Sequence, residues 1–351
     1  MVNADNLLKW YDAQAREMPW RVPPAQAKAG KRPDPYHIWL SEVMLQQTTV
    51  AAVHKYFLAF TTRWPDVHAL ARAKDSAVMG EWAGLGYYAR ARNLLKCARI
   101  VSKNMDGRFP DTEDALRTLP GIGPYTAAAI AAIAFQRQAT VVDANVERVM
   151  ARIHAICDPL PDCKQTLRDL AEALTPRHRA GDYAQAVMDL GATLCGKKPA
   201  CDACPWQHGC VAFSNGTAAE LPKKRAKPAK PHRQGIAYFA CRADGAILLE
   251  TRPQKGLLGG MLCLPCSAWQ AEAPIENPPL KATWQALNTP VNHVFTHFHL
   301  ALTVHVTNVA QNAKPLRGEF VTRVDPDALP SVMRKIYQLG ISAIHDSKGR
   351  N

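Results

Sequence analysis

The sequence predicts a multidomain protein with an all-α domain over residues 1–213, a linker over 214–235 and an α+β domain over 236–351. Three observations support this division. Apolar residues recur at helical spacing, with turns between them, throughout the first domain. A basic, proline-rich stretch without periodicity follows, which is typical of an extended, semi-stiff connection. Beyond it the apolar pattern changes to the alternation of β-strands.

Composition and charge favour a polyanionic partner. The 351-residue chain is 47% hydrophobic, which supports real cores, and its formal net charge is +13. This excess favours nucleic acid over a membrane surface. No apolar run reaches the roughly 18 residues of a membrane span, and the N-terminus lacks the basic start and apolar core of a signal peptide. We therefore expect a soluble, monomeric protein of a bacterial cytoplasm, associated with the nucleoid.

The N-terminal part predicts two helices separated by a loop. Residues 3–18 have the apolar face of an amphipathic helix, and a loop rich in Pro, Lys and Gly runs to about residue 35. Residues 36–60 carry an apolar stripe at helical spacing, so we expect one long helix there. Glu42 and Gln46 are four residues apart and should share a face away from much of that stripe. An acid in such a position is most often a solvated surface residue.

Residues 82–93 combine a glycine turn with aromatic and basic side chains. Gly84 and Gly86 predict the turn, Tyr87 stands at the start of the following helix, and Arg90 lies within it. One interpretation is an ordinary helix start with packed aromatics. The other is a wedge, in which an aromatic side chain enters a base step while the cations contact phosphates.

Residues 119–148 place two functional signals close together. Gly121 and Gly123 form a tight turn before a helix, where converging amides and the helix dipole favour an anion such as phosphate. Asp143 follows a β-branched stretch and precedes another helical pattern. Both features also have a common structural explanation, because glycines often precede helices and Asp is a frequent N-cap.

Four cysteines fall in one short segment, Cys195-x5-Cys201-x2-Cys204-x5-Cys210. In a reducing compartment such clustering indicates a metal site rather than disulfides, and four cysteines can hold zinc or a [4Fe–4S] cluster. Zinc sites usually pair two short Cys-x-x-Cys loops, whereas this segment has one. The unequal spacing after a helix therefore favours the iron–sulfur cluster.

The C-terminal domain has strand patterns and a final helix. Residues 236–252 predict a β-hairpin, residues 293–306 alternate strictly between an apolar side and a histidine-containing side, and a helix is expected near 330–344. Cys263 and Cys266 have no second cysteine pair nearby. We expect them to pack in the sheet rather than to bind a metal.

Several of these segments together resemble the MutY adenine glycosylases, which are helix-hairpin-helix DNA glycosylases. The sequence Trp-Leu-Ser-Glu-Val-Met-Leu-Gln-Gln-Thr at 39–48 matches the family signature. The glycine turn at 82–93, the Leu-Pro-Gly-Ile-Gly hairpin with its Val-Asp-x-Asn-Val segment, and the run at 183–195 also match. The likeness covers nearly the whole chain and is weakest in 214–235 and 267–290.

The resemblance implies a helix-hairpin-helix glycosylase domain with a [4Fe–4S] module, followed by a Nudix-like domain that recognises the lesion. It implies catalytic roles for Glu42, Asp143, Asn145 and Tyr125. It implies contacts with DNA or the target base for Arg21, Gln46, Gln47, Leu85, Tyr87, Arg90, Gly121, Gly123, Gln185, Thr296 and His297. Cys195, Cys201, Cys204 and Cys210 become the cluster ligands. Within these sets Tyr87 is the wedge beside the oxidised guanine, and Gln47 probes the opened stack.

The chain departs from the family pattern at several positions. The loop between Cys195 and Cys201 is one residue shorter than in the family, Ala144 stands where Gly is usual, and Glu147 stands where a basic residue is frequent. Thr296 replaces Ser in the family's Phe-Ser-His loop for 8-oxoguanine, which keeps the hydroxyl and adds a methyl group. The Nudix box with its magnesium-binding acids is absent, so we expect recognition without nucleotide hydrolysis.

The implied reaction is removal of adenine opposite 8-oxoguanine or guanine in double-stranded DNA, after the base has been flipped out of the duplex. Adenine leaves poorly unless N7 is protonated, which requires a carboxylic acid kept protonated near neutral pH by burial. The sugar then becomes oxocarbenium-like and needs a nearby anion. The resemblance makes Glu42 the acid and Asp143 the anion.

Three alternative functions make different demands on the same residues. An endonuclease III-like glycosylase and lyase acting on damaged pyrimidines needs a lysine nucleophile where this chain has Tyr125. A non-catalytic lesion-binding protein would not need Glu42 and Asp143, and both acids are present. A nucleotide pyrophosphatase would need the absent metal-binding acids. Other repair or replication proteins are also considered as partners.

Overall fold

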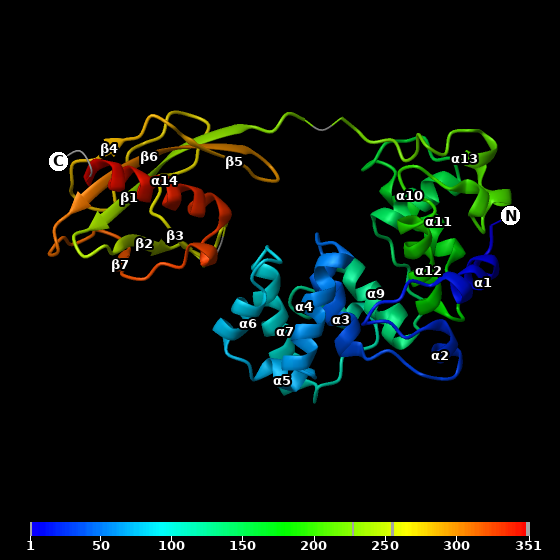
Figure 1. Ribbon diagram of the computed structural model, residues 1–351. Helices are drawn as coiled ribbons and strands as arrows, with labels where there is room; N and C mark the ends of the chain where they lie inside the picture. The colour runs from blue at the N-terminus through cyan, green and yellow to red at the C-terminus, as the bar shows by residue number, and fades with distance from the viewer. Residues whose placement is uncertain (1, 227, 254–255, 349–351) are drawn as a thin grey trace. The chain divides into compact units, whose positions relative to one another are not determined.

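The computed structural model describes residues 2–226, 228–253 and 256–348. It divides into two compact units, Met1–Ala226 and Lys227–Asn351, which we call the helical unit and the sheet unit (Figure 1). The predicted multidomain fold, all-α before α+β, is confirmed. No helix in the described residues is long and apolar enough to cross a membrane.

The boundary between the units falls inside the predicted linker, 214–235. Leu221 is buried in the core of the helical unit, and the first strand of the sheet unit begins at His232. Both ends of the predicted linker therefore belong to folded units. Lys227, between them, lies outside the described residues.

The helical unit is a set of helices joined by short turns. Its elements are α1 (Ala4–Gln14), α2 (Pro24–Lys28), α3 (Pro35–Leu45), α4 (Val50–Arg63), α5 (Val67–Ala71), α6 (Asp75–Glu81), α7 (Ala89–Asn104), α8 (Glu113–Arg117), α9 (Pro124–Phe135), α10 (Ala144–Ile153), α11 (Lys164–Leu174), α12 (Ala180–Ala192), η1 (Cys201–Ala203), η2 (Gln207–Gly209) and α13 (Val211–Ser214).

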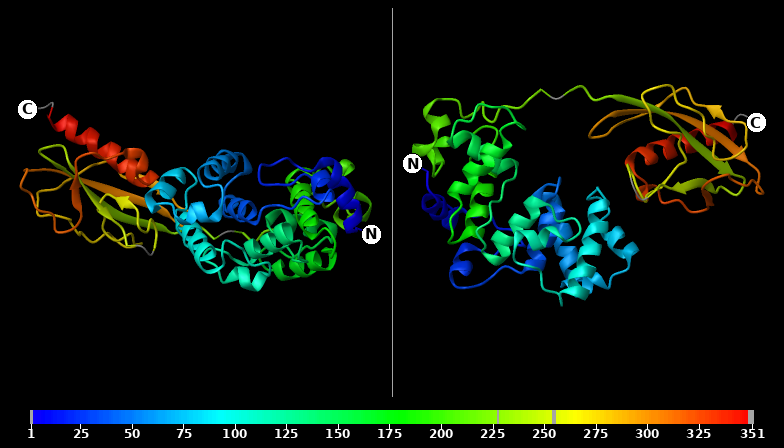
Figure 2. Two further views of the ribbon diagram at one scale, coloured as in Figure 1. Left: turned by 90° about the horizontal axis from the view of Figure 1, so that it is seen from below. Right: turned by 180° about the vertical axis from the view of Figure 1, so that it is seen from behind.

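Helix α9 is central to this unit. Figures 1 and 2 show α1 and α10–α13 on one side of it and α4–α7 on the other. Every side chain from Thr126 to Ala134 is buried, as expected for a helix that is apolar on all sides. Six alanines in this stretch let α3, α8 and α12 approach closely, and these three helices pack against α9. The hairpin sequence therefore begins the helix around which the unit is assembled.

The prediction of one helix over residues 36–60 is wrong. Helix α3 ends at Leu45, Gln47 adopts a left-handed φ of 57°, and Thr49 caps α4 by accepting a hydrogen bond from the Ala52 amide at 3.3 Å. The apolar stripe continues on both sides of the break because both helices bury it. The break leaves Gln47 on an exposed turn.

Two smaller differences affect the N-terminal segment. Helix α1 ends at Gln14, earlier than the predicted residue 18, and the predicted loop contains the short helix α2, which begins at Pro24. Proline suits this first helical position because its missing amide has no intrahelical partner there.

The two hairpin glycines have different reasons to be glycine. Gly121 has a φ of 80°, and a Cβ there would lie 2.9 Å from Asn93 Cβ, so a larger residue is excluded. Gly123 is the N-cap of α9 in extended backbone that any residue adopts. A Cβ at Gly123 would meet nothing within 4 Å, which leaves the N-terminus of α9 open to a close neighbour such as a phosphate.

The sheet unit packs one helix on a seven-stranded sheet in its described residues. Its elements are β1 (His232–Arg242), β2 (Ile247–Thr251), β3 (Leu262–Cys263), β4 (Gln285–Ala286), β5 (Val291–Val294), β6 (His299–Val309), β7 (Glu319–Val321), η3 (Pro326–Ala328) and α14 (Ser331–Lys348). The order is β3-β2-β1-β6-β4, with β5 beside β6 and β7 beside β2, and only β1 and β6 are paired in parallel among these strands. The predicted β1–β2 hairpin and final helix are confirmed.

The strand pattern over residues 293–306 is interrupted by a turn. Strands β5 and β6 form an antiparallel hairpin in which Val294 pairs with His299. Thr296 and His297 lie exposed in the turn between them. Alternation in the sequence extends through the turn, so periodicity alone did not reveal the reversal. Cys263 and Cys266 are buried in this unit as expected.

Gly340 brings α14 close to the sheet. A Cβ at this position would lie 2.4 to 2.7 Å from three ring carbons of Phe239 on β1. Such distances cannot be accommodated unless the ring or the helix moves. The absence of a side chain at Gly340 therefore sets the distance between α14 and β1.

Gly340→Ala should destabilise the sheet unit by about 1–3 kcal/mol because the added methyl overpacks the Phe239 ring. This is opposite to helix propensity, by which alanine gains up to about 1 kcal/mol over glycine. Urea unfolding of the full chain measures the change. Ser342→Ala, at an exposed position of the same helix, should stay within about 0.5 kcal/mol. An unchanged or raised stability for Gly340→Ala would contradict the close-packing argument.

Candidate active site

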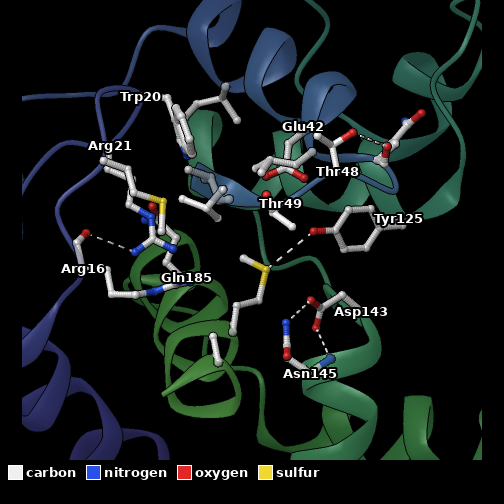
Figure 3. Close-up of a pocket in the computed structure, with 18 of the residues that line it drawn as sticks. Arg16, Trp20, Arg21, Glu42, Thr48, Thr49, Tyr125, Asp143, Asn145 and Gln185 are labelled. Atoms are coloured by element: carbon white, nitrogen blue, oxygen red, sulfur yellow. Dashed lines mark hydrogen bonds between the residues drawn. The ribbon is translucent and has the colours of Figure 1, made fainter. Parts of the chain in front are cut away.

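A cavity of about 700 Å³ lies where the N-terminal segment, the end of α3 and the first residues of α9 and α10 meet α12 (Figure 3). The predicted residues that line it are Arg21, Glu42, Gln46, Gln47, Tyr125, Asp143, Asn145 and Gln185. The fold therefore gathers residues from segments far apart in the sequence. All four residues predicted to be catalytic are among them.

Glu42 is buried, although its sequence position suggested a face away from the apolar stripe. Only 6% of the Glu42 surface is exposed to solvent. Burial raises the pKa of Glu42 to about 7, and the nearby Asp143 acts in the same direction. A hydrogen bond with Tyr125 and the charge of Arg21 oppose this rise. Glu42 therefore retains a proton near neutral pH, which is what a general acid requires.

Tyr125 faces the same space from the second residue of α9 (Figure 3). Burial, followed by the negative charges of Glu42 and Asp143, raises the pKa of Tyr125 well above its usual 10. Its single hydroxyl proton points to Met188 Sδ at 3.6 Å, and the Glu42 carboxyl is the alternative acceptor for it. Tyr125 is thus a neutral phenol that can hold Glu42 but cannot act as an amine nucleophile.

Asp143 is both a helix cap and a wall of the cavity. One carboxylate oxygen accepts the backbone amides of Asn145 at 2.9 Å and Val146 at 2.8 Å, and the other accepts the Asn145 side-chain amide at 2.8 Å. Three N–H donors at the N-terminus of α10 therefore fix the orientation of this carboxyl group. Asp143 can therefore be both the N-cap of α10 and a functional group of the cavity.

A chain of hydrogen bonds leads from Asp143 towards the cysteine segment. Asn145 Oδ1 accepts from Arg148 Nη2 at 2.9 Å, and Arg148 Nε donates to the Cys195 carbonyl at 2.7 Å. Arg148 Nη2 also donates to the Gly191 carbonyl at 2.6 Å. The orientation of Asn145 thus depends on the backbone around Cys195.

Arg21 is held in place by a buried acid that the sequence analysis missed. Its guanidinium donates to the two oxygens of Asp189 at 2.7 and 3.0 Å, and the Asp189 side chain is fully buried. Arg16 Nε also donates to Asp189, at 2.6 Å. An aspartate inside the apolar run of α12 was the available signal, because a buried acid requires charged or hydrogen-bonding partners.

The two glutamines at the end of α3 differ in exposure. Gln46 is partly buried and donates from Nε2 to Thr126 Oγ1 at 3.2 Å, which ties the turn to α9. Gln47 is exposed at the edge of the cavity. Gln185 is buried and its amide donates to the Gly181 carbonyl at 3.3 Å. Only Gln47 of these three reaches outward.

The glycine turn before α7 presents one aromatic residue to solvent. Tyr87 is 54% exposed and has a left-handed φ of 49°, whereas Leu85 is only 6% exposed and packs in the core. Arg90 is partly buried and its guanidinium donates to acceptors within the protein, including the Leu85 carbonyl at 2.9 Å. The outward-facing member of this group is therefore Tyr87.

The four clustered cysteines surround a second, small cavity of about 20 Å³. None of the four forms a disulfide in the described part of the chain. Arg152 Nη1 donates to Cys195 Sγ at 3.3 Å and to the Gly196 carbonyl at 2.7 Å. In residues 2–226, 228–253 and 256–348 no three His, Cys, Asp or Glu side chains are already grouped to hold a single ion. By number and chemistry, four thiols around one cavity fit a [4Fe–4S] cluster.

Two departures from the family pattern have local explanations. Ala144 is the first residue of α10 with ordinary helical backbone, so no glycine is required after Asp143. Glu147 forms an ion pair with Lys164 Nζ at 3.0 Å, which joins α10 to α11. Glu147 therefore has a partner within the protein.

Glu42→Gln should remove a pH-dependent loss of stability. Because the folded pKa of Glu42 is about 7 and its usual value is 4.5, the folded protein keeps a proton that the unfolded chain releases. The free energy of unfolding should then fall as the pH rises between these values, by up to roughly 3 kcal/mol. Glutamine does not titrate, so the variant should gain stability relative to the native protein across this window.

Urea unfolding of the native protein and of Glu42→Gln at about pH 5 and about pH 8 measures this change in the free energy of unfolding. Glu172→Gln, at an exposed acid of α11, serves as a control for the same substitution. An equal stability difference between native protein and Glu42→Gln at both pH values would show that Glu42 is not held protonated.

Comparison with known proteins agrees with both units. A model described as HhH-GPD superfamily base excision DNA repair protein matches residues 40–176, and a NUDIX domain model matches residues 237–339. The solved structure of a thermostable thymine-DNA glycosylase aligns with a TM-score of 0.52 and 29% identity, over 60% of this chain and 95% of that one. The fold expected from the sequence is thus confirmed in both parts.

Curated relatives extend the match along the chain. The adenine DNA glycosylase of Homo sapiens is 34% identical over 95% of this chain and 73% of the human protein. That of Buchnera aphidicola subsp. Acyrthosiphon pisum is 33% identical over 84% of this chain and 83% of the relative. This similarity spans the cavity and the sheet unit alike, and it confirms the predicted resemblance: the chain belongs to the MutY family of adenine DNA glycosylases.

Proposed function

We propose that this base-excision repair glycosylase removes adenine paired with 8-oxoguanine or guanine in double-stranded DNA, without cutting the strand. The observation that carries this proposal is the pair of carboxyl groups in one cavity. Burial keeps Glu42 protonated near neutral pH, whereas three N–H donors surround Asp143. A buried acid beside a second carboxyl that is held by N–H donors is what acid-assisted cleavage of an N-glycosidic bond needs.

The reaction follows from this arrangement. The flipped adenine enters the cavity and Glu42 transfers its proton to N7. The bond between C1′ and N9 then breaks, and its electron pair enters the protonated base. Asp143 stabilises the positive charge that develops at C1′, either as an ion pair or through a transient covalent bond. Water adds to C1′ and leaves an abasic site, while its proton returns to the carboxylate of Glu42.

The surrounding side chains hold the two acids and the base. The Tyr125 hydroxyl can turn to donate to Glu42, and Asn145 orients Asp143. Arg21 and Gln185 line the same cavity and are assigned to the base. The side chain of Arg21 is 8% exposed, so its position is set before DNA arrives.

Recognition of the lesion is assigned to exposed residues outside the cavity. Tyr87 and Gln47 face solvent from two neighbouring turns of the helical unit, and we propose that both enter the base stack. Thr296 and His297, in the exposed turn of the sheet unit, are proposed to read 8-oxoguanine. Gly121 and Gly123 offer the open N-terminus of α9 to a phosphate.

The cavity argues against a lyase. No lysine is among the described residues that line it, and Tyr125 stands where an endonuclease III-like enzyme needs its amine. A non-catalytic lesion-binding protein would have no use for a buried, protonated Glu42, since burial of an acid without function costs stability. We also propose that the protein acts as a monomer on chromosomal DNA in a bacterial cytoplasm; bacterial proteins are among its relatives.

Single-turnover release of adenine from a duplex with one 8-oxoguanine:adenine pair should be observed, with strand scission only after alkali. The rate should fall as the pH rises through about 7, because Glu42 then loses its proton. Glu42→Gln should abolish release, a loss of at least about 100-fold, and retain binding to the lesion duplex. The thymine:adenine duplex is the control.

Three other outcomes of this assay would change the proposal. Scission without alkali, together with trapping by borohydride, would favour the lyase. Tight lesion binding without release would favour the non-catalytic protein. Preserved turnover in Glu42→Gln would exclude Glu42 as the acid.

We propose that Cys195, Cys201, Cys204 and Cys210 hold a [4Fe–4S] cluster with a structural role in DNA docking. Purification without oxygen should yield close to four irons and four sulfides per chain. Cys204→Ala should reduce iron content, whereas Cys157→Ala, at an exposed cysteine outside the segment, should not. One zinc per chain and no sulfide would contradict the assignment.

A further inference from the structure

We propose that Arg90 is a positioning residue that locks two neighbouring turns, residues 46–49 and 84–88, into one rigid element, so that Gln47 and Tyr87 enter DNA together. This inference rests on the proposed function, in which these two side chains probe the opened stack. From the sequence alone, a phosphate contact is expected for Arg90. The hydrogen bonds of its guanidinium favour an internal role.

Both turns carry their exposed residue in a strained backbone conformation. Gln47 has a φ of 57° and Tyr87 a φ of 49°, a left-handed region that costs a non-glycine residue roughly 1–2 kcal/mol. Such conformations persist only where the surrounding structure holds them. The two turns follow α3 and α6, and Figure 1 shows α3, α4, α6 and α7 as one group of helices.

Arg90 holds the first turn through the end of α3. Its Nη1 donates to the carbonyls of Val43 and Met44, both at 3.0 Å, and its Nη2 approaches Thr48 Oγ1 at 3.3 Å. The last carbonyls of a helix lack intrahelical partners, and a cation is favourable there. The guanidinium therefore acts as the C-terminal cap of α3, immediately before Gln47.

The same guanidinium holds the second turn. Its Nη2 donates to the carbonyls of Leu85 at 2.9 Å and Gly86 at 3.4 Å. Its central carbon lies 5.3 Å from the ring centroid of Trp82 and 5.7 Å from that of Tyr87, within range of a cation–π interaction. The base of Tyr87 is thus fastened to the group that caps α3.

Tyr56 and Trp82 also hold the second turn in place. Tyr56 of α4 donates its hydroxyl to the Ala83 carbonyl at 2.7 Å, and Trp82 Nε1 donates to the Gly86 carbonyl at 3.0 Å. A Cβ at Gly84 would lie 2.3 Å from the Tyr56 hydroxyl. These contacts all hold the second turn, whereas Arg90 contacts both turns.

The remaining donor of Arg90 is not available to DNA. Its Nε is buried and has no hydrogen-bond partner among the described residues, while both terminal nitrogens already donate to protein oxygens. Recruiting this side chain to a phosphate would break the contacts on both turns. Its position is therefore suited to transmitting a movement of one turn to the other.

A double-mutant cycle in the full chain tests the coupling. Gln47→Ala, Tyr87→Leu and the double variant are compared in single-turnover adenine release, with native Arg90 and with Arg90→Met. With native Arg90 the two losses should be non-additive by at least about threefold. In the Arg90→Met background the two fold-losses in rate should multiply, as they do for independent sites. Additive losses in the native background, or unchanged coupling in Arg90→Met, would overturn the proposal.

Amide hydrogen exchange tests the same idea without any activity. Arg90→Met should accelerate exchange in both turns, at 46–49 and 84–88. Arg90→Lys should do so too, because a single ammonium cannot span the acceptors of a planar guanidinium. Lys keeps the charge, so this variant remains informative if Arg90→Met does not fold.

Arg92→Met, two residues along the same helix, is the matched control and should leave exchange in both turns unchanged. Acceleration of only one turn in the Arg90 variants would show a local anchor and overturn the proposal. A native protein that releases no adenine would instead contradict the proposed function, and the exchange result would still decide the role of Arg90.

Discussion

Burial of the Glu42 carboxyl is the constraint on which the rest of the site depends. A carboxyl removed from water keeps its proton to a higher pH, and here the pKa reaches about 7. The neighbouring Asp143 contributes to that rise and is itself held by a helix N-terminus. The alanine-rich α9 permits this burial, because its small side chains let α3 and α12 each pack closely against it.

Several arginines of this basic chain are used inside the protein rather than offered to DNA. Arg21 pairs with Asp189, Arg148 and Arg152 donate to the backbone of the cysteine segment, and Arg90 joins two turns. Each of these guanidinium groups presents several N–H donors in one plane, and it does so where backbone carbonyls or a buried carboxylate need hydrogen-bond partners. A net charge of +13 therefore overstates the positive charge available for phosphates.

Periodicity predicted where chain segments are buried better than where they end. The apolar stripe of residues 36–60 runs through the break at Gln47, and the alternation of 293–306 runs through the turn at Thr296. In both cases the segments on each side bury the same kind of face, so the pattern has no discontinuity. The prediction failed at the two exposed turns to which we assign contacts with DNA, where backbone geometry is set by function rather than by core packing.

The sequence by itself determined the two-part fold, the residues able to form a site, and their family, because motifs such as residues 39–48 and the cysteine segment carry that information locally. Only the tertiary structure decided that Glu42 is buried, that Asp189 anchors Arg21, and that Arg90 faces inward. The physical reason is that a pKa or a hydrogen-bond partner depends on neighbours in space. Those neighbours come from distant parts of the chain, and no local pattern specifies them.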